Sequence, residues 1–169
     1  MKYAITGHTG GIGFSLGEKI NDLGFSYKGF SRSNGYDINI KKDRQRIIEE
    51  SSDCDIFINN AQNGYGQVDM LVDLYHAWKN TNKTIINIGS EIAEDHMILK
   101  GGYDHLLEYQ VVKKALKVLH NDIQKLEAGI NMKYVYFGYV GTDRILKKYP
   151  NLPKNQYITV EEAVRQILS

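Results

Sequence analysis

Two residues four positions apart, Tyr109 and Lys113, carry side chains suited to proton transfer. Residues four apart on a helix lie on the same face, one turn from each other. A free tyrosine has a pKa near ~10, which is too high for a reversible acid or base at neutral pH. An ammonium at ~4 Å contributes about 4 kcal/mol at an effective dielectric of ~20, enough to lower that pKa by up to roughly three units. The same pair also fits an ordinary exposed aromatic–lysine contact on an amphipathic helix. Other residues must therefore show whether the pair takes part in proton transfer.

A second stretch, TGHTGGIG at residues 6–13, holds four glycines in eight positions directly after the apolar run YAI. Glycine loses more conformational entropy on folding than any other residue, so the cluster indicates a turn that something approaches closely. The end of a strand and the start of a helix offer backbone N–H groups to a phosphate. The spacing Gly7-x-x-x-Gly11-x-Gly13 matches neither G-x-G-x-x-G nor a P-loop, because position 16 is Leu16 and no Lys-Ser/Thr pair follows. Alone, the cluster would be interpreted as a glycine-rich surface turn.

The elements that must position these residues alternate between strand-like and helix-like segments. Strands are expected at 2–6, 25–30, 55–59, 84–89 and 133–140, and helices at 12–23, 44–50, 68–80, 106–129 and 159–168. The helix at 106–129 is expected to end at Gly129, and Thr159 to cap the last helix. Alternating strands and helices predict an α/β fold, a doubly wound, Rossmann-like parallel sheet of about six strands in one domain spanning 1–169.

Composition and charge exclude several classes of function. The 169 residues are 42% hydrophobic and 24% charged, as is typical of a globular domain. The formal net charge of +1 gives no electrostatic case for nucleic acid or a membrane surface, and no apolar run is long enough to span a bilayer. The basic cluster at 41–46 is expected to be the solvated face of a short helix. The five histidines lack the spacing of a metal site.

The number of cysteines indicates the cellular compartment in which the protein is expected. The single cysteine, Cys54, excludes an intramolecular disulfide and is expected to be a buried structural thiol. The chain starts directly in a strand pattern, without a basic-then-apolar leader. We therefore expect a cytoplasmic protein.

Five motifs, in order along essentially the whole chain, together resemble the short-chain dehydrogenase/reductase family. The glycine cluster from Thr6 to Gly13 resembles its cofactor fingerprint, and Asn59-Asn60-Ala61 resembles its Asn-Asn-Ala-Gly segment. The remaining three are INIGS, ending at Ser90, Tyr109-x-x-x-Lys113 followed by Lys-Ala-Leu, and Gly138-x-x-x-Thr142, with Phe137 in place of the family's proline.

The resemblance implies a nicotinamide dinucleotide cofactor, a small carbonyl or alcohol substrate and no metal. In the family the tyrosine is the acid/base, the lysine also binds the nicotinamide ribose, and the serine hydrogen-bonds the substrate oxygen. These catalytic roles fall on Tyr109, Lys113 and Ser90. The cofactor-binding residues that the resemblance implies are Gly7, Thr9, Gly10, Gly11, Ile12, Gly13, Ser31, Arg32, Ser33, Asp37, Asn60, Ala61, Tyr109, Lys113, Gly138 and Thr142.

The end of the second strand indicates which nicotinamide cofactor is preferred. An NAD site usually places an acid there to bind the ribose hydroxyls. Residues 31–33 read Ser-Arg-Ser, without an acid. An arginine flanked by hydroxyls suits a 2′-phosphate, so NADP(H) is favoured over NAD(H). The alternative is that Arg32 only caps an exposed turn.

Several positions depart from the family pattern. Gln62 replaces a glycine, and nineteen positions separate Ser90 from Tyr109, which indicates an insertion. Tyr103 lies nearer the usual distance but lacks its lysine, because position 107 is Leu107. The family's catalytic asparagine has no clear counterpart, and the segment after Thr142 is short.

These departures keep two further hypotheses open. One is a catalytically silent dinucleotide-binding sensor or partner-binding module of the same fold. The other is a nucleotide-sugar epimerase or dehydratase, for which the short C-terminal region leaves little room.

The helices at 68–80 and 106–129 carry more apolar residues than one core-facing stripe requires. An exposed apolar patch usually marks an interface, and the family commonly pairs subunits through these two helices. We therefore predict an isologous homo-oligomer.

Overall fold

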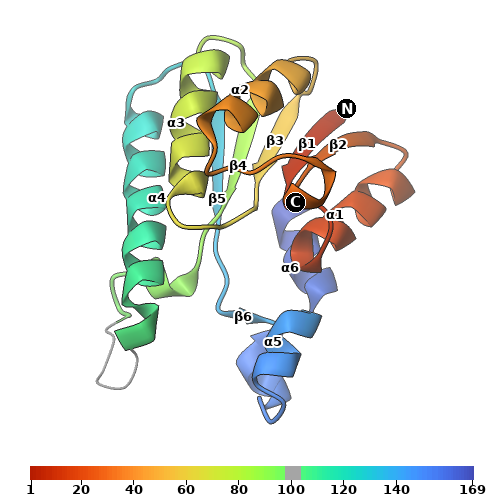
Figure 1. Ribbon diagram of the computed structural model, residues 1–169, viewed down its shortest axis with the longest axis vertical. Helices are drawn as coiled ribbons and strands as arrows, with labels where there is room; N and C mark the ends of the chain where they lie inside the picture. The colour runs from red at the N-terminus through yellow and green to blue at the C-terminus, as the bar shows by residue number, and fades with distance from the viewer. Residues whose placement is uncertain (98–103) are drawn as a thin grey trace.

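A computed structural model describes residues 1–97 and 104–169 and shows a parallel β-sheet with helices on both faces (Figure 1). The strands lie in the order β2 (Ser26–Phe30), β1 (Lys2–Thr6), β3 (Ile56–Asn59), β4 (Thr84–Ile88) and β5 (Asn131–Val135), and every neighbouring pair is parallel. The predicted α/β parallel sheet is thus confirmed, with five strands. A separate two-stranded sheet pairs β6 (Tyr139–Val140) with β7 (Tyr157–Ile158).

The helices divide between the two faces of the sheet. One face is covered by α1 (Gly11–Asp22) and α6 (Val160–Leu168), the other by α2 (Lys41–Glu50), α3 (Gly66–Trp78) and α4 (Leu107–Lys125) (Figure 1). The short α5 (Asp143–Lys148) lies with β6 beyond the carboxyl ends of the main strands. Single turns of 3₁₀ helix follow β2 (η1, Arg32–Asn34) and β4 (η2, Glu91–Ala93), precede α4 (η3, Asp104–Leu106) and precede β7 (η4, Lys154–Gln156).

Two buried clusters, one on each face, hold the layers together. Successive side chains of a strand point to opposite faces, so Ile5 of β1 packs with α1 and α6 while Ala4 packs with α2, α3 and α4. A parallel sheet covered on both faces needs apolar side chains in both directions, as in the run Ile56-Phe57-Ile58 of β3. Cys54 is buried, as predicted, and its thiol donates to the carbonyl of Tyr3.

Strand order determines where a ligand can enter. The chain passes from β1 to β2 on one side and then crosses to β3 on the other side of β1. The loop after β1 leads to α1 on one face of the sheet and the loop after β3 leads to α3 on the other face, and α/β proteins bind ligands at such a switch point.

Two elements end at different residues in the structure than the sequence predicted. Helix α4 stops at Lys125 rather than at Gly129, because the chain turns back to meet the loop after α3, where Asn80 N–H bonds to the carbonyl of Ala128. The strand predicted at 133–140 divides into β5 and β6, because Val140 leaves the main sheet to pair with Ile158. Thr159 caps α6 as predicted, in a reciprocal capping box with Glu162.

The structure corrects the prediction that the basic cluster at 41–46 is the solvated face of a helix. The cluster does start α2, three residues earlier than expected, but Arg44 is only 7% exposed. Its guanidinium donates to Asp73 of α3 at 2.7 Å and to the carbonyl of Ile38 at 2.8 Å. The Ile38 carbonyl belongs to the loop before α2, but only the tertiary contact between α2 and α3 supplies Asp73, so this arginine is structural and not part of a solvated face.

Candidate functional site

The glycine loop joins β1 to α1 at the switch point. Gly7 has a φ of +74°, and its N–H donates to the carbonyl of Phe30 at 2.7 Å. A Cβ at Gly7 would lie 3.1 Å from the Asn60 amide nitrogen and 3.2 Å from Ala61. A Cβ at Gly13 would lie 2.8 Å from the same amide nitrogen and closer still to the carbonyl oxygen of Gly7. Glycine at these two positions lets the first turn of α1 rest directly on the end of β1.

The start of α1 presents backbone donors without a side-chain cap. Gly10 is the N-cap residue and offers no side-chain acceptor, and a Cβ there would meet no atom within 4 Å. Thr9 is exposed beside it, and Ile12 is half-buried in the first turn. The methyl of Thr142 closes one side of the loop, 3.3 Å from a Cβ built on Gly11. This arrangement of N–H groups and open space can take an anion such as a phosphate.

The turn after β3 is fastened to the end of β1. The backbone N–H groups of Asn60 and Ala61 both donate to the Thr6 hydroxyl at 3.0 Å, and the Asn60 side chain donates to the Thr6 carbonyl at 3.0 Å. The structure therefore brings Asn60 and Ala61 directly beside Gly7. The Asn60 side-chain amide thus donates to the protein's own backbone.

At the end of β2, residues 31–34 form a tight polar turn. The Asn34 side chain accepts from the Ser31 N–H at 2.8 Å and donates to the Gly29 carbonyl at 2.8 Å, while the Ser31 and Ser33 hydroxyls bond to each other at 2.8 Å. Arg32, at the start of η1, is exposed and forms no ion pair within the described part of the chain. Its guanidinium is available to a ligand.

Two neighbours of that turn have defined contacts. The Asp37 carboxylate accepts from the Asn39 N–H at 2.9 Å, so it stabilises its own loop. The His8 ring lies against Gly29, where an added Cβ would come 2.6 Å from Nδ1, and this buried nitrogen has no hydrogen-bond partner among the described residues.

Ser90, Tyr109 and Lys113 come from β4 and α4. Ser90 is the N-cap of η2, directly after β4, and Tyr109 is half-buried in the first turn of α4. The Gln110 side chain donates to the carbonyl of Ile92 at 3.0 Å, which fastens the start of α4 to the loop after Ser90. The Lys113 Nζ lies 5.7 Å from the centre of the Tyr109 ring, so the two residues share one helix face. Tyr103 lies outside the described residues.

Lys113 is 3% exposed and is held by oxygen atoms from two other elements. Its Nζ donates to Gln67 Oε1 of α3 at 2.8 Å and to the carbonyl of Ile88 at 3.0 Å. Burial disfavours the charged form and lowers the pKa of Lys113 to about 7. The ammonium assumed from the sequence is therefore in exchange with a neutral amine near neutral pH.

Gln67 contacts the candidate site through Lys113 and was not predicted from the sequence. It is completely buried, and its Nε2 donates to the carbonyls of Asn59 at 2.7 Å and Ile88 at 3.0 Å. The spacing of the chain gives no motif for it. An indirect signal exists in Asn59 and Asn87, which are polar residues at core-facing positions of strands, because buried polar groups require polar partners.

The Tyr134 side chain packs next to the end of β4, at Gly89, the residue before Ser90. Its ring lies on Gly89, where an added Cβ would come 2.8 Å from the ring edge, and its hydroxyl is buried without a hydrogen-bond partner in the described ranges. Burial, with a smaller contribution from the Glu94 carboxylate, raises the pKa of Tyr134 well above its usual range. This tyrosine is a neutral wall of the site.

The loop after β5 completes the site. Glu91 donates its N–H to the carbonyl of Phe137 at 2.8 Å, and its carboxylate lies 2.5 Å from a Cβ built on Gly138. Thr142 caps α5, and its hydroxyl accepts from the Ile145 N–H. The two predicted residues of this loop thus face the loops after β4 and β1, respectively.

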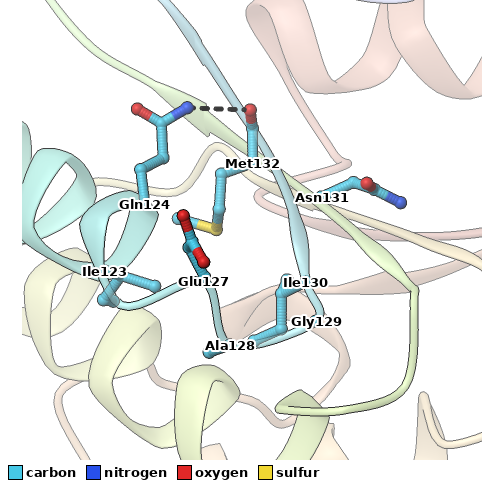
Figure 2. A pocket seen from close by; sticks show the side chains of 8 residues that line it. All are labelled: Ile123, Gln124, Glu127, Ala128, Gly129, Ile130, Asn131 and Met132. Atoms are coloured by element: carbon cyan, nitrogen blue, oxygen red, sulfur yellow. Dashed lines mark hydrogen bonds between the residues drawn. The ribbon is translucent and has the colours of Figure 1, made fainter.

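A separate hollow lies at the opposite edge of the sheet. This cavity of about 400 Å³ lies between the end of α4 and the start of β5 and is lined by residues 123–124 and 127–132. Figure 2 shows the side chains that line it. It contains none of the predicted site residues. Within residues 1–97 and 104–169, no cluster of His, Cys, Asp and Glu is arranged to hold a metal ion, and no helix is both long and apolar enough to cross a membrane.

The fold is that of the short-chain dehydrogenases and reductases. The chain superimposes on a 3-alpha-hydroxysteroid dehydrogenase from Pseudomonas sp. B-0831, complexed with NADH, with a TM-score of 0.75 at 18% identity, covering 99% of this chain and 88% of the other. It is similar to a short-chain dehydrogenase from Sphingobium yanoikuyae in complex with NADPH, with a TM-score of 0.71 at 17% identity, covering 99% and 82%. A 3-ketoacyl-(acyl-carrier-protein) reductase from Brucella melitensis, complexed with NADH, gives a TM-score of 0.75 at 16% identity, covering 98% and 88%. Comparison with protein-family models and with curated proteins found no match.

Proposed function

We propose that this protein is an NAD(P)-dependent oxidoreductase of the short-chain dehydrogenase/reductase type, acting on a small carbonyl or alcohol. The observation that carries the proposal is that the glycine loop and Ser90 both follow strands at the carboxyl edge of the sheet, while Lys113, on the same face of α4 as Tyr109, donates to the carbonyl of Ile88 at the end of β4. Structural neighbours that were solved with NADH or NADPH support the choice of cofactor.

The residues present fit a nicotinamide dinucleotide. The first turn of α1 has no side-chain cap, and glycine leaves open space before it, which suits the pyrophosphate. The exposed Arg32, with Ser31 and Ser33, would hold a 2′-phosphate, so we propose a preference for NADP(H) over NAD(H). Asp37, Asn60, Ala61, Gly138 and Thr142 would form the remaining walls. When bound, the cofactor supplies or accepts a hydride.

The chain's own residues would handle the proton. In carbonyl reduction the Tyr109 hydroxyl gives its proton to the carbonyl oxygen, and the Ser90 hydroxyl donates a hydrogen bond to the same oxygen. Lys113 would hold the nicotinamide ribose and favour the ionised form of Tyr109 after proton transfer. The half-buried Tyr134, which packs against Gly89 next to Ser90, would help to exclude water from this part of the site.

One observation favours the second candidate, a catalytically silent dinucleotide-binding protein. Two acceptors already engage the buried Lys113, and burial lowers its pKa to about 7. A lysine that is partly neutral supports an ionised tyrosine less strongly than a permanent ammonium does. The single free cysteine is buried, which suits a cytoplasmic location for either candidate.

A binding titration followed by turnover tests the proposal. The protein should quench or shift the fluorescence of NADPH with saturation, and should then oxidise NADPH with some members of a panel of aldehydes, ketones and quinones. Saturable binding without turnover, together with a Tyr109 hydroxyl pointing away from the nicotinamide in a co-crystal structure, would establish the silent binder. Absence of binding to both NADPH and NADH would reject both candidates.

A further inference from the structure

The Gln67 carboxamide can adopt only one orientation in this structure. Its Nε2 donates to two backbone carbonyls, those of Asn59 and Ile88, which accept only. Reversing the amide would place Oε1 against both carbonyl oxygens, where neither partner can donate, and would place Nε2 against the ammonium form of Lys113, where neither partner can accept. The oxygen of Gln67 must therefore face Lys113.

A second layer of buried amides fixes the backbone around Gln67. The Asn59 side chain donates to the Gln67 carbonyl at 3.0 Å and to Asn87 Oδ1 at 2.9 Å. Asn87 in turn donates through Nδ2 to Nδ1 of His120 at 3.1 Å, which requires the imidazole to be unprotonated at that nitrogen. The four side chains Gln67, Asn59, Asn87 and His120 are all buried, so their hydrogen bonds resist competition from water.

We propose that Gln67 is a positioning residue, which fixes the amino group of Lys113 for its role toward Tyr109 and the cofactor ribose. This inference rests on the proposed function. An amino or ammonium group can have up to three N–H donors. Gln67 Oε1 and the Ile88 carbonyl engage two of them, and the third of the ammonium remains for the site.

The neutral carboxamide also matters for charge. Lys113 forms no ion pair with a carboxylate in the described part of the chain, although it is almost fully buried. A carboxylate in the place of Gln67 would form an ion pair with the ammonium. That ion pair would reduce the electrostatic effect of Lys113 on the Tyr109 hydroxyl. An acceptor without charge locates the amine and leaves it able to exchange its proton near neutral pH.

Two variants separate positioning from charge. Gln67→Met keeps the side-chain length and removes all three hydrogen bonds, so the amine loses its fixed place and cofactor affinity should fall about tenfold or more. Gln67→Glu places an opposite charge beside Nζ and should raise the pKa of Lys113 by about one to three pH units. Gln110→Met is a matched control, because Gln110 is also buried and bonds to two carbonyls but not to Lys113.

The titration of Lys113 is measured by NMR in the protein without cofactor, with lysine labelled at the ε-carbon and Lys113 assigned by its loss in Lys113→Met. Binding of NADPH and NADH is measured for each folded variant in parallel. A raised pKa in Gln67→Glu, weakened binding in Gln67→Met and neither change in Gln110→Met would support the proposal. An unchanged pKa in Gln67→Glu, or full cofactor affinity in Gln67→Met, would overturn it.

If the wild type binds no dinucleotide, the proposed function fails and the role of Gln67 toward the ribose fails with it. The NMR titration still decides whether Gln67 controls the charge of Lys113.

Discussion

At the scale of single residues, removing the Tyr109 hydroxyl distinguishes two hypotheses: an enzyme and a protein that only binds a dinucleotide. Tyr109→Phe removes one oxygen and keeps the ring beside Lys113 on the same helix face. We expect cofactor affinity to persist while carbonyl reduction falls by ~10²–10⁴-fold, the usual effect of losing a general acid. Steady-state kinetics and a binding titration on the same preparations measure both. Equal turnover in the variant would exclude Tyr109 as the acid.

We propose that Arg32 determines the cofactor preference. This guanidinium is exposed beside the Ser31 and Ser33 hydroxyls and forms no ion pair with any other described residue. We expect Arg32→Ala to weaken NADPH binding about tenfold or more and to leave NADH binding unchanged, because only NADPH carries the 2′-phosphate. Arg165→Ala, which removes an exposed charge from α6, is the control. The same dissociation constant for NADPH and NADH in the wild type would refute the preference.

At the scale of elements, the contact between β1 and α1 depends on Gly13. An added methyl would meet the Gly7 carbonyl and the Asn60 amide, so Gly13→Ala forces α1 away from the strand. We expect a loss of about 1–3 kcal/mol in the free energy of unfolding, together with weaker cofactor binding. Gly10→Ala is the matched control for stability, since that residue has a φ of −165° and open space around it. Urea denaturation of both variants measures the difference, and equal stability would contradict the close contact.

At the scale of the whole molecule, α4 carries an apolar stripe on the face turned away from the sheet. Leu107, Val111 and Val118 are 56%, 45% and 58% exposed, whereas Val112 and Leu116 are in the core. We predict a homo-oligomer paired through this stripe together with α3. Light scattering should give an oligomer for the wild type and a monomer for the double variant Val111→Glu, Val118→Glu. A monomeric wild type at micromolar concentration would count against the prediction.

The stability of the protein should rise with pH because of Lys113. Its pKa is about 7 in the folded chain and 10.5 as a free group, so between these values the unfolded state binds more protons. Stability then increases with pH across that window by up to about 1.4 kcal/mol per pH unit. Urea denaturation at pH 7 and pH 9 should show a smaller increase in Lys113→Met than in the wild type. Equal increases would mean that Lys113 titrates normally.

The sequence by itself determined the features that depend on local spacing. The alternation of apolar runs predicted the parallel sheet, and the residue type of Thr159 predicted the N-cap of the last helix. The glycine loop and the shared face of Tyr109 and Lys113 were likewise readable, because turn and helix geometry acts over a few residues.

The tertiary structure alone decided which buried polar groups meet. Gln67 and Lys113 are 46 positions apart, and Arg44 and Asp73 are 29 positions apart. No spacing rule connects residues on different helices, so Arg44 was expected at the surface and Gln67 was not singled out. The same holds for the end of α4 and the division of β5 from β6, because partners elsewhere in the fold supply their backbone hydrogen bonds. Buried polar groups must find partners, but only the packing of the layers determines which ones are within reach.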